Sequence, residues 1–206
     1  FVRAQESGLK YKLINGNTEY EVTGAGLATG DVVVDAVYRG KPVTSIADKA
    51  FYNNSKITSI TVGSNIKKIG ERAFAKCSQL TSVTIENGVT EIGEKTFQSS
   101  KALVSVSLPD SVTVITHSMF SWCSSLENLT IGDYITKIDD YAFSNCKALK
   151  SIALPNTVTS IGEYAFSDCE TMTNLSLGSG LVSIANYAFT KCLALPSITL
   201  PTSLES

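Results

Sequence analysis

The chain has 206 residues, a length that fits one domain or two small ones. Apolar residues make up 43% and charged residues 17%, below the roughly 25% usual in soluble proteins. The formal net charge of −2 argues against an electrostatic nucleic-acid binder, and no apolar run is long enough to cross a membrane. The single histidine, His117, excludes a multi-histidine metal site.

The first 46 residues differ from the rest of the chain. In residues 1–8, Val2 and Ala4 are spaced as at the end of a signal peptide, which predicts a leader remnant or a disordered segment. Residues 9–22 alternate in polarity around Asn15-Gly16 and predict a β-hairpin, followed by a Gly- and Thr-rich loop. We expect residues 9–46 to form an N-terminal hairpin cap and a degenerate first coil.

From residue 47 to residue 206 the sequence repeats with a period of 23. All phenylalanines but Phe1 follow this period: Phe51, Phe74, Phe97, Phe120, Phe143, Phe166 and Phe189. Isoleucine stands five residues before each of them, and aliphatic residues or Met recur six, nine, eleven and fifteen residues after. Such a period is typical of a solenoid, in which one unit buries its apolar face only by stacking on the next. Because the sequence stops within a unit and without a cap, we expect it to be a fragment of a longer protein.

Within each unit, the pattern predicts three kinds of local structure. The segment that begins six residues after Phe ends in a period of two and predicts a short strand. The segment before the next Phe predicts a second extended piece, and 162–169, with Ala165, Phe166 and Cys169 at helical spacing, predicts one or two helical turns. The expected fold is an α/β solenoid with a parallel β-sheet on one side, short helices or helical turns on the other, and an N-terminal hairpin cap.

The repeat resembles the BspA-type leucine-rich repeat of bacterial and protist surface proteins. The resemblance rests on segments such as Ile161-Gly162-Glu163-Tyr164-Ala165-Phe166-Ser167-Asp168-Cys169 and Ser151-Ile152-Ala153-Leu154-Pro155-Asn156-Thr157-Val158, and covers about residues 9–206. It implies a curved solenoid in a secreted or cell-surface protein. It also implies adhesion to other cells or to matrix proteins such as fibronectin or fibrinogen, an analogy from family and not from a site.

The five cysteines all stand three residues after a repeat phenylalanine. They are Cys77, Cys123, Cys146, Cys169 and Cys192. Their common position indicates a packing role, a buried column of free thiols. The alternative is a disulfide between neighbours such as Cys146 and Cys169, which requires close Cα atoms.

The outward positions of the predicted strands form two ladders of small residues, all polar except Ala153, here called the outward ladders. The first comprises Ser59, Ser82, Ser105, Asn128, Ser151, Asn174 and Ser197, and the second Thr61, Thr84, Ser107, Thr130, Ala153, Ser176 and Thr199. One interpretation is structural, with hydroxyls hydrogen-bonded along the stack. The other is a nearly uncharged concave surface that binds an extended partner. The candidate contact residues there are Ser105, Asn128, Ser151, Asn174, Thr130 and Ser176.

A second candidate surface lies around the phenylalanines. Tyr141, Tyr164 and Tyr187 each stand two residues before Phe and are expected to stack as an exposed column, and Trp122, the only tryptophan, stands two residues after Phe120. Exposed aromatic side chains are enriched in binding hot spots. The alternative is that these rings only cover the backbone of the next coil.

The sequence therefore predicts a non-catalytic, exported binding protein. No nucleophile is paired with a base and no carboxylates cluster, so we expect neither enzymatic activity nor a cofactor or metal. The expected partner is a protein or polysaccharide, with no nucleic acid and no membrane insertion. The alternative is a passive spacer or stalk that presents another domain of a longer protein.

Overall fold

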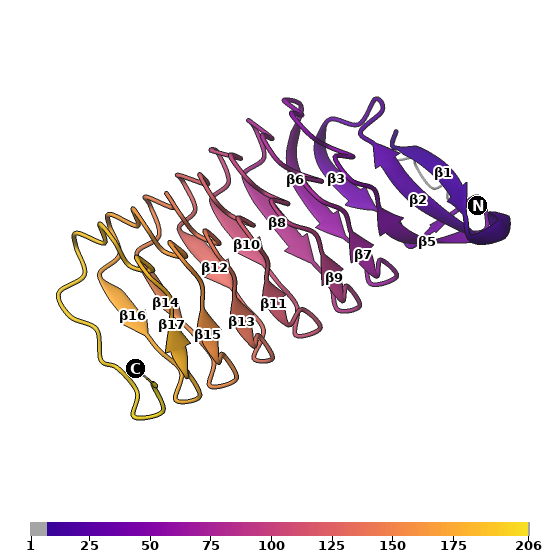
Figure 1. Ribbon diagram of the computed structural model, residues 1–206. Helices are drawn as coiled ribbons and strands as arrows, with labels where there is room; N and C mark the ends of the chain where they lie inside the picture. The colour runs from indigo at the N-terminus through magenta and orange to yellow at the C-terminus, as the bar shows by residue number, and fades with distance from the viewer. Residues whose placement is uncertain (1–7, 206) are drawn as a thin grey trace.

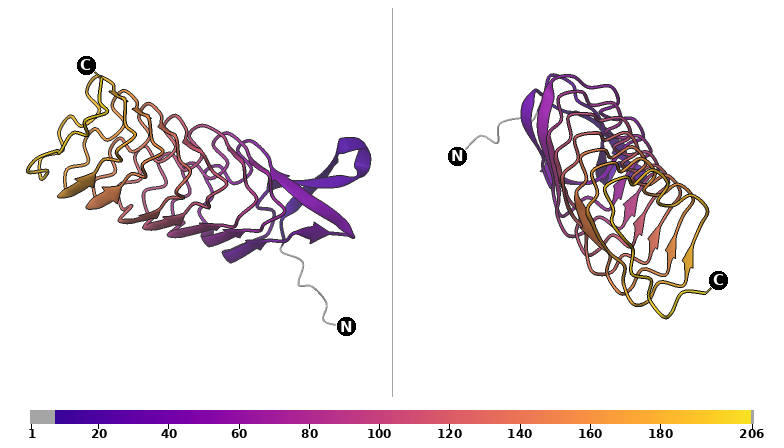
Figure 2. Two further views of the ribbon diagram at one scale, coloured as in Figure 1. Left: turned by 90° about the horizontal axis from the view of Figure 1, so that it is seen from below. Right: turned by 90° about the vertical axis from the view of Figure 1, so that its left-hand side faces the viewer.

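Each 23-residue unit forms one coil of a β-solenoid in the computed structural model, which describes residues 8–205 (Figure 1). A coil consists of a longer strand, a short strand and a turn segment that contains the repeat phenylalanine. The coils stack along one axis, with the N-terminal hairpin at one end and residue 205 at the other (Figure 2). The leader predicted at residues 1–8 lies, except for Gly8, outside the described residues.

The longer strands form a parallel ladder on one side of the coils. They are β3 (Gly30–Val34), β6 (Ile57–Val62), β8 (Ser82–Ile85), β10 (Ser105–Ser107), β12 (Asn128–Thr130), β14 (Ser151–Ala153) and β16 (Asn174–Ser176). Residues one repeat apart pair directly, for example Ser105 with Asn128, so the sequence period sets the register. Pairing is continuous from β3 to β12 and resumes between β14 and β16.

The second extended piece predicted in each unit is present as a strand, which has two residues in every coil except the first, where β5 has six. These strands are β5 (Lys41–Ile46), β7 (Lys68–Ile69), β9 (Glu91–Ile92), β11 (Val114–Ile115), β13 (Lys137–Ile138), β15 (Ser160–Ile161) and β17 (Ser183–Ile184). Each of them also pairs in parallel with the strand one repeat away. One series of paired strands runs from β5 to β9, and a second runs from β11 to β17.

The predicted hairpin is present at the N-terminal end. Strands β1 (Lys10–Ile14) and β2 (Glu19–Gly24) pair antiparallel around a 3₁₀ turn at Asn15–Asn17, η1. β2 pairs in parallel with β5, which β4 (Val37–Tyr38) joins from the other side. The first coil has both of its strands, since β3 pairs with β6 and β5 with β7. The boundary between the cap region and the repeats, at residue 46, stays a prediction.

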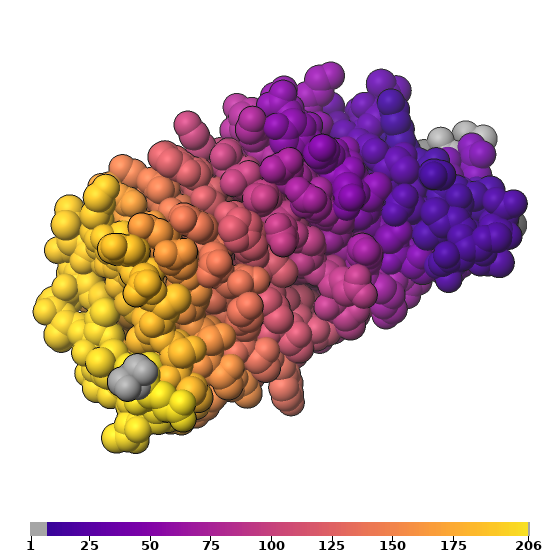
Figure 3. Space-filling view, viewed as in Figure 1, coloured from indigo at the N-terminus to yellow at the C-terminus, as the bar shows by residue number. Residues whose placement is uncertain are grey.

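The core is a continuous column of phenylalanine rings. Neighbouring rings are stacked with centroids 5.0–5.5 Å apart, from Phe51 to Phe189. All of them except Phe189 are among the most deeply buried side chains. Offset stacks of this kind add to the stabilisation that burial itself provides. Side chains fill the spaces between the strands, so the coils form one continuous body (Figure 3).

The prediction of short helices or helical turns on the phenylalanine side is wrong. Within residues 8–205 the only helical element is η1, and 162–169 consists of turns. Alternate amides of each turn segment donate to the next coil, as Phe143 N does to Ala165 O at 2.7 Å, instead of to a carbonyl four residues back. The residues two before and two after each Phe have positive φ, for example Tyr141 (56°) and Asn145 (62°), which a helix cannot accommodate.

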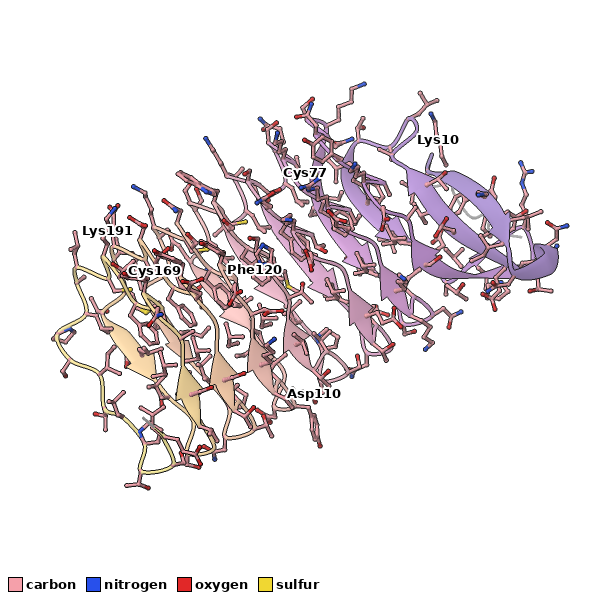
Figure 4. All side chains as sticks on the ribbon, viewed as in Figure 1. Lys10, Cys77, Asp110, Phe120, Cys169 and Lys191 are labelled. Atoms are coloured by element: carbon pink, nitrogen blue, oxygen red, sulfur yellow. The ribbon has the colours of Figure 1, made fainter. Side chains whose placement is uncertain are left out.

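The cysteines form the predicted column of free thiols. Four are buried and Cys192 is half-buried. Each Sγ donates to the carbonyl of the phenylalanine in the preceding coil, as Cys123 does to Phe97 O at 3.0 Å, and Ser100 makes the same contact with Phe74 O. A small donor at this position satisfies a buried carbonyl without widening the coil. Cys77 and Cys169 mark this column on either side of Phe120 (Figure 4).

Candidate binding surfaces

From β6 to β16 the outward ladders lie on the solvent side of the longer strands, whereas their last members, Ser197 and Thr199, lie in a segment that forms no strand. β10 and β12 align Ser105 with Asn128, and β14 and β16 align Ser151 with Asn174 and Ala153 with Ser176. Asn128, Thr130, Ser151, Asn174 and Ser176 are exposed, and Ser105 is half-buried. Neighbouring members of a ladder are separated by the spacing of the strands, about 4.8 Å. The structure thus brings all six candidate residues together on one face.

Almost none of the polar groups in the outward ladders has a partner within the chain. Among the described residues, Ser59 is the one ladder member whose side chain makes a hydrogen bond, donating to Asp31 at 2.6 Å. The interpretation in which the hydroxyls bond along the stack is therefore wrong for these ladders. Hydroxyls do bond along the stack elsewhere, as Thr159 Oγ1 does to Thr136 O.

Asp31 adds one negative charge to the N-terminal end of this face. It lies on β3, beside Ser59 and Thr58, and the hydroxyl hydrogen bonds from these two residues lower the pKa of its carboxyl. Residue 31 precedes the first repeat phenylalanine, so the repeat pattern gave no signal for it. The parallel pairing of β3 with β6 reveals its position.

The ladder face is hollowed near its C-terminal end. An open depression of about 440 Å³ there is bordered by Asn174, Ser176, Asn156, Ser179 and Thr199, with apolar contributions from Leu175, Leu177 and Pro201. Two of the six candidate residues thus border a concave site that offers both hydroxyl and amide groups.

The second candidate surface, here called the turn face, consists of the segments 47–54, 70–77, 93–100, 116–123, 139–146, 162–169 and 185–192. Tyr141 and Tyr164 stack at 5.2 Å between ring centroids, and Tyr164 and Tyr187 at 5.0 Å. Tyr187 is 61% exposed and Tyr141 37%, whereas Tyr164 is half-buried between them. Partial desolvation, followed by the neighbouring tyrosines, raises the pKa of Tyr164. The predicted column forms, with its middle ring partly covered.

Trp122 and His117 lie in the fourth turn segment. Trp122 is 49% exposed although its backbone has a φ of 64°. The ring of His117 lies edge-on to Tyr141 at 5.8 Å, which extends the aromatic column by one residue. The turn face therefore presents an aromatic row from the fourth coil to the seventh.

The turn face also carries charged residues that the sequence analysis did not select as candidates. In the first three coils, Lys49, Arg72 and Lys95 occupy the positions that the tyrosines occupy in the last three. Lys76 lies over the ring of Tyr52 at 5.5 Å, and Asp168 pairs with Lys191 at 3.4 Å. The sequence contained a signal for these residues. When the repeats are aligned, the position two residues before Phe changes from basic in the first three units to tyrosine in the last three.

In the described part of the chain, no three His, Cys, Asp or Glu side chains come together as metal ligands. Burial raises the pKa of Cys77 and of Cys123 to about 12, so these thiols are poor nucleophiles at neutral pH. No helix among residues 8–205 has the length and apolarity required to cross a bilayer.

Comparison with protein families gives a match over most of the chain. The model of the BspA type leucine-rich repeat region matches residues 44–152 and 136–206. A comparison with curated proteins finds no match.

Several solved structures have a similar fold. The leucine-rich repeat protein TpLRR of T. pallidum is 28% identical, with a TM-score of 0.84 over 93% of this chain and 89% of that one. The pneumococcal vaccine antigen PcpA is 21% identical, with a TM-score of 0.58 over 98% of this chain and 70% of that one. A leucine-rich cell surface protein of Faecalibacterium prausnitzii is 20% identical, with a TM-score of 0.51 over 97% of this chain and 82% of that one.

Proposed function

The chain belongs to the BspA-type leucine-rich repeat family, and we propose that it is an exported adhesion protein that binds a macromolecule through its outward ladders. Proteins of this repeat type are generally non-catalytic and bind other proteins. The observation that carries the proposal is that, among the described residues, no ladder side chain except Ser59 makes an internal hydrogen bond. A row of polar groups with no partner in the chain is available to a ligand without first breaking a contact.

The chemistry of the ladders favours an extended, weakly charged partner. From β6 to β16 the ladders contain no charged residue, and they offer donors and acceptors at the spacing of the coils. Asn128 and Asn174 each add an amide that can donate and accept at once. A matrix protein with an extended segment, such as fibronectin or fibrinogen, or a neutral polysaccharide fits this surface. Secretion or display at the cell surface is part of the proposal, supported by the family and by the cell-surface protein of similar fold.

The test is binding of the purified chain to immobilised fibronectin, fibrinogen and a panel of neutral polysaccharides at physiological salt. The variant that carries Asn128→Lys and Asn174→Lys places two charges on the ladders at exposed positions. We expect saturable binding by the wild type and a loss of about tenfold or more in affinity for this variant, as for hot-spot residues.

The matched control is Thr113→Lys, at an exposed position away from the ladders where the second coil already has Lys67. It should bind as the wild type does. Binding that survives the ladder substitutions would contradict the placement of the site. If the wild type bound nothing in the panel, adhesion would be refuted for these ligands and the spacer function favoured.

A further inference from the structure

The columns of the turn face are in register from the first coil to the seventh. The residues two before Phe hold consecutive positions, since Lys49 N donates to Glu71 O, Arg72 N to Glu94 O, and the pattern continues to Tyr164. In chain order this column reads Lys49, Arg72, Lys95, Ser118, Tyr141, Tyr164, Tyr187. Three cations and three tyrosines thus lie at equal distances on either side of Ser118.

The column two residues after Phe has a related symmetry. It reads Asn53, Lys76, Ser99, Trp122, Asn145, Asp168, Lys191. Reversal about Trp122 places Lys76 opposite Asp168 and Trp122 opposite itself. Both columns therefore have their centre in the same coil, the fourth.

The net charge of the turn face changes along the same axis. Segments 47–54, 70–77 and 93–100 contain four basic and three acidic residues. Segment 116–123 has no charged residue apart from His117, and the last three segments contain one basic and four acidic residues. One end of the turn face is thus complementary in charge to the other end.

From this arrangement we infer that the turn face binds a second copy of this chain, antiparallel, about a two-fold axis beside Trp122. A two-fold contact places the same patch of both copies face to face. The two Trp122 rings meet at the centre, and Lys95, Arg72 and Lys49 of each copy face Tyr141, Tyr164 and Tyr187 of the other. Cations over tyrosine rings attract the ring quadrupole, and Lys76 meets Asp168 as an ion pair.

The surface between the two columns allows a close approach. The residues that directly follow Phe are small and buried in the fourth, fifth and sixth coils, at Ser121, Ser144 and Ser167, and also in the second, at Ala75. The third coil has the half-buried Gln98 there, and the first has Tyr52. From the fourth coil to the sixth, the two columns therefore lie on either side of a row of small residues. Trp122, 49% exposed, is the largest projecting side chain at the centre, where aromatic hot spots concentrate in interfaces.

The column three residues before Phe is mostly acidic, and in this dimer it would face the same column of the second copy. Most of this charge is already compensated within each copy. Glu71 lies 3.6 Å from Arg72 and Glu94 lies 3.8 Å from Lys95. The carboxylates of Asp48 and Asp140 accept the amides of Glu71 and Glu163 at 2.8 and 2.7 Å. The contact between the two copies is therefore attractive, because the cations and the central aromatic ring outweigh the repulsion between the acidic columns.

The experiment is sedimentation over a range of chain concentrations, with the emission of the single tryptophan recorded in parallel. We expect a shift from monomer to dimer with rising concentration, and a blue shift of emission as Trp122 leaves water. Trp122→Asn, which introduces the residue that the first and fifth coils have at Asn53 and Asn145, should weaken the dimer about tenfold or more. A chain that stays monomeric at all concentrations would overturn the inference.

A charge exchange tests the antiparallel geometry itself. Lys76→Asp and Asp168→Lys each introduce a residue type that other coils already have at this position. Each variant alone should weaken the homodimer, because like charges then face each other across the interface. Mixed together, the two variants should form a heterodimer, because every exchanged charge then meets its opposite. Lys67→Asp, away from the turn face, is the control and should leave the dimer unchanged. A dimer that is unaffected by the two single exchanges, or a mixture that fails to associate, would refute this interface. Because the ladder substitutions lie elsewhere, failure of this test leaves the proposed adhesion intact.

Discussion

Truncation of one ring in the phenylalanine column should reveal how much the column stabilises the solenoid. Phe143 is fully buried, and its ring stacks on Phe120 at 5.3 Å and on Phe166 at 5.0 Å. Phe→Ala in a core costs about 3–5 kcal/mol, and each lost aromatic pair is worth about 0.5–1.5 kcal/mol within that sum. With two pairs lost, we expect Phe143→Ala to lower the free energy of unfolding by about 4–5 kcal/mol.

The chain contains its own control for this prediction. Phe189 is only half-buried and stacks on one ring, Phe166, at 5.4 Å, so Phe189→Ala should cost about 2 kcal/mol. Urea unfolding followed by far-UV circular dichroism measures both losses, and unchanged m-values verify that the two variants unfold over the same range of structure. A loss below about 1 kcal/mol at Phe143, or an equal loss at Phe189, would refute the reasoning that ring burial and stacking dominate the core.

Two further predictions concern the thiols. In the folded protein a thiol reagent should label Cys192, which is half-buried, well before the four buried cysteines, and all five should react after unfolding; fewer than five would indicate a disulfide. Stability should also depend on alkaline pH. Burial raises the pKa of Cys123 from about 9.0 to about 12, so the folded state keeps a proton that the unfolded state releases. The free energy of unfolding should therefore fall as the pH rises from about 9 to about 12, by up to about 1.4 kcal/mol per pH unit for each such thiol. Cys123→Ser, which introduces the hydroxyl that the third coil already has at Ser100, should flatten this dependence in thermal unfolding at pH 7 and pH 10, and an unchanged slope would contradict the assignment.

The helical turns expected around each Phe show why one part of the fold could not be predicted from the sequence. Ala165, Phe166 and Cys169 have helical spacing, but in a stacked coil the same residues point inward from a tight turn. The turn requires positive φ two residues before and after Phe, and Lys, Arg, Tyr and Trp occupy these positions as well as Asn, so no glycine marks the turn. Amides that bond to the next coil replace the helical bonds, and this choice exists only when two coils are side by side.

The 23-residue period by itself determined the solenoid, the parallel pairing at one repeat's distance, the core columns and the position of the thiols, because identical units stack only in register. Alternation around Asn15-Gly16 determined the hairpin. Tertiary structure alone decided which polar side chains lack a partner, since the hydroxyls of the outward ladders and those of Thr159 and its neighbours look alike in sequence. It also decided that the tyrosines stack at about 5 Å and that Tyr164 is partly covered. Such contacts depend on side-chain direction in adjacent coils, which no single repeat specifies.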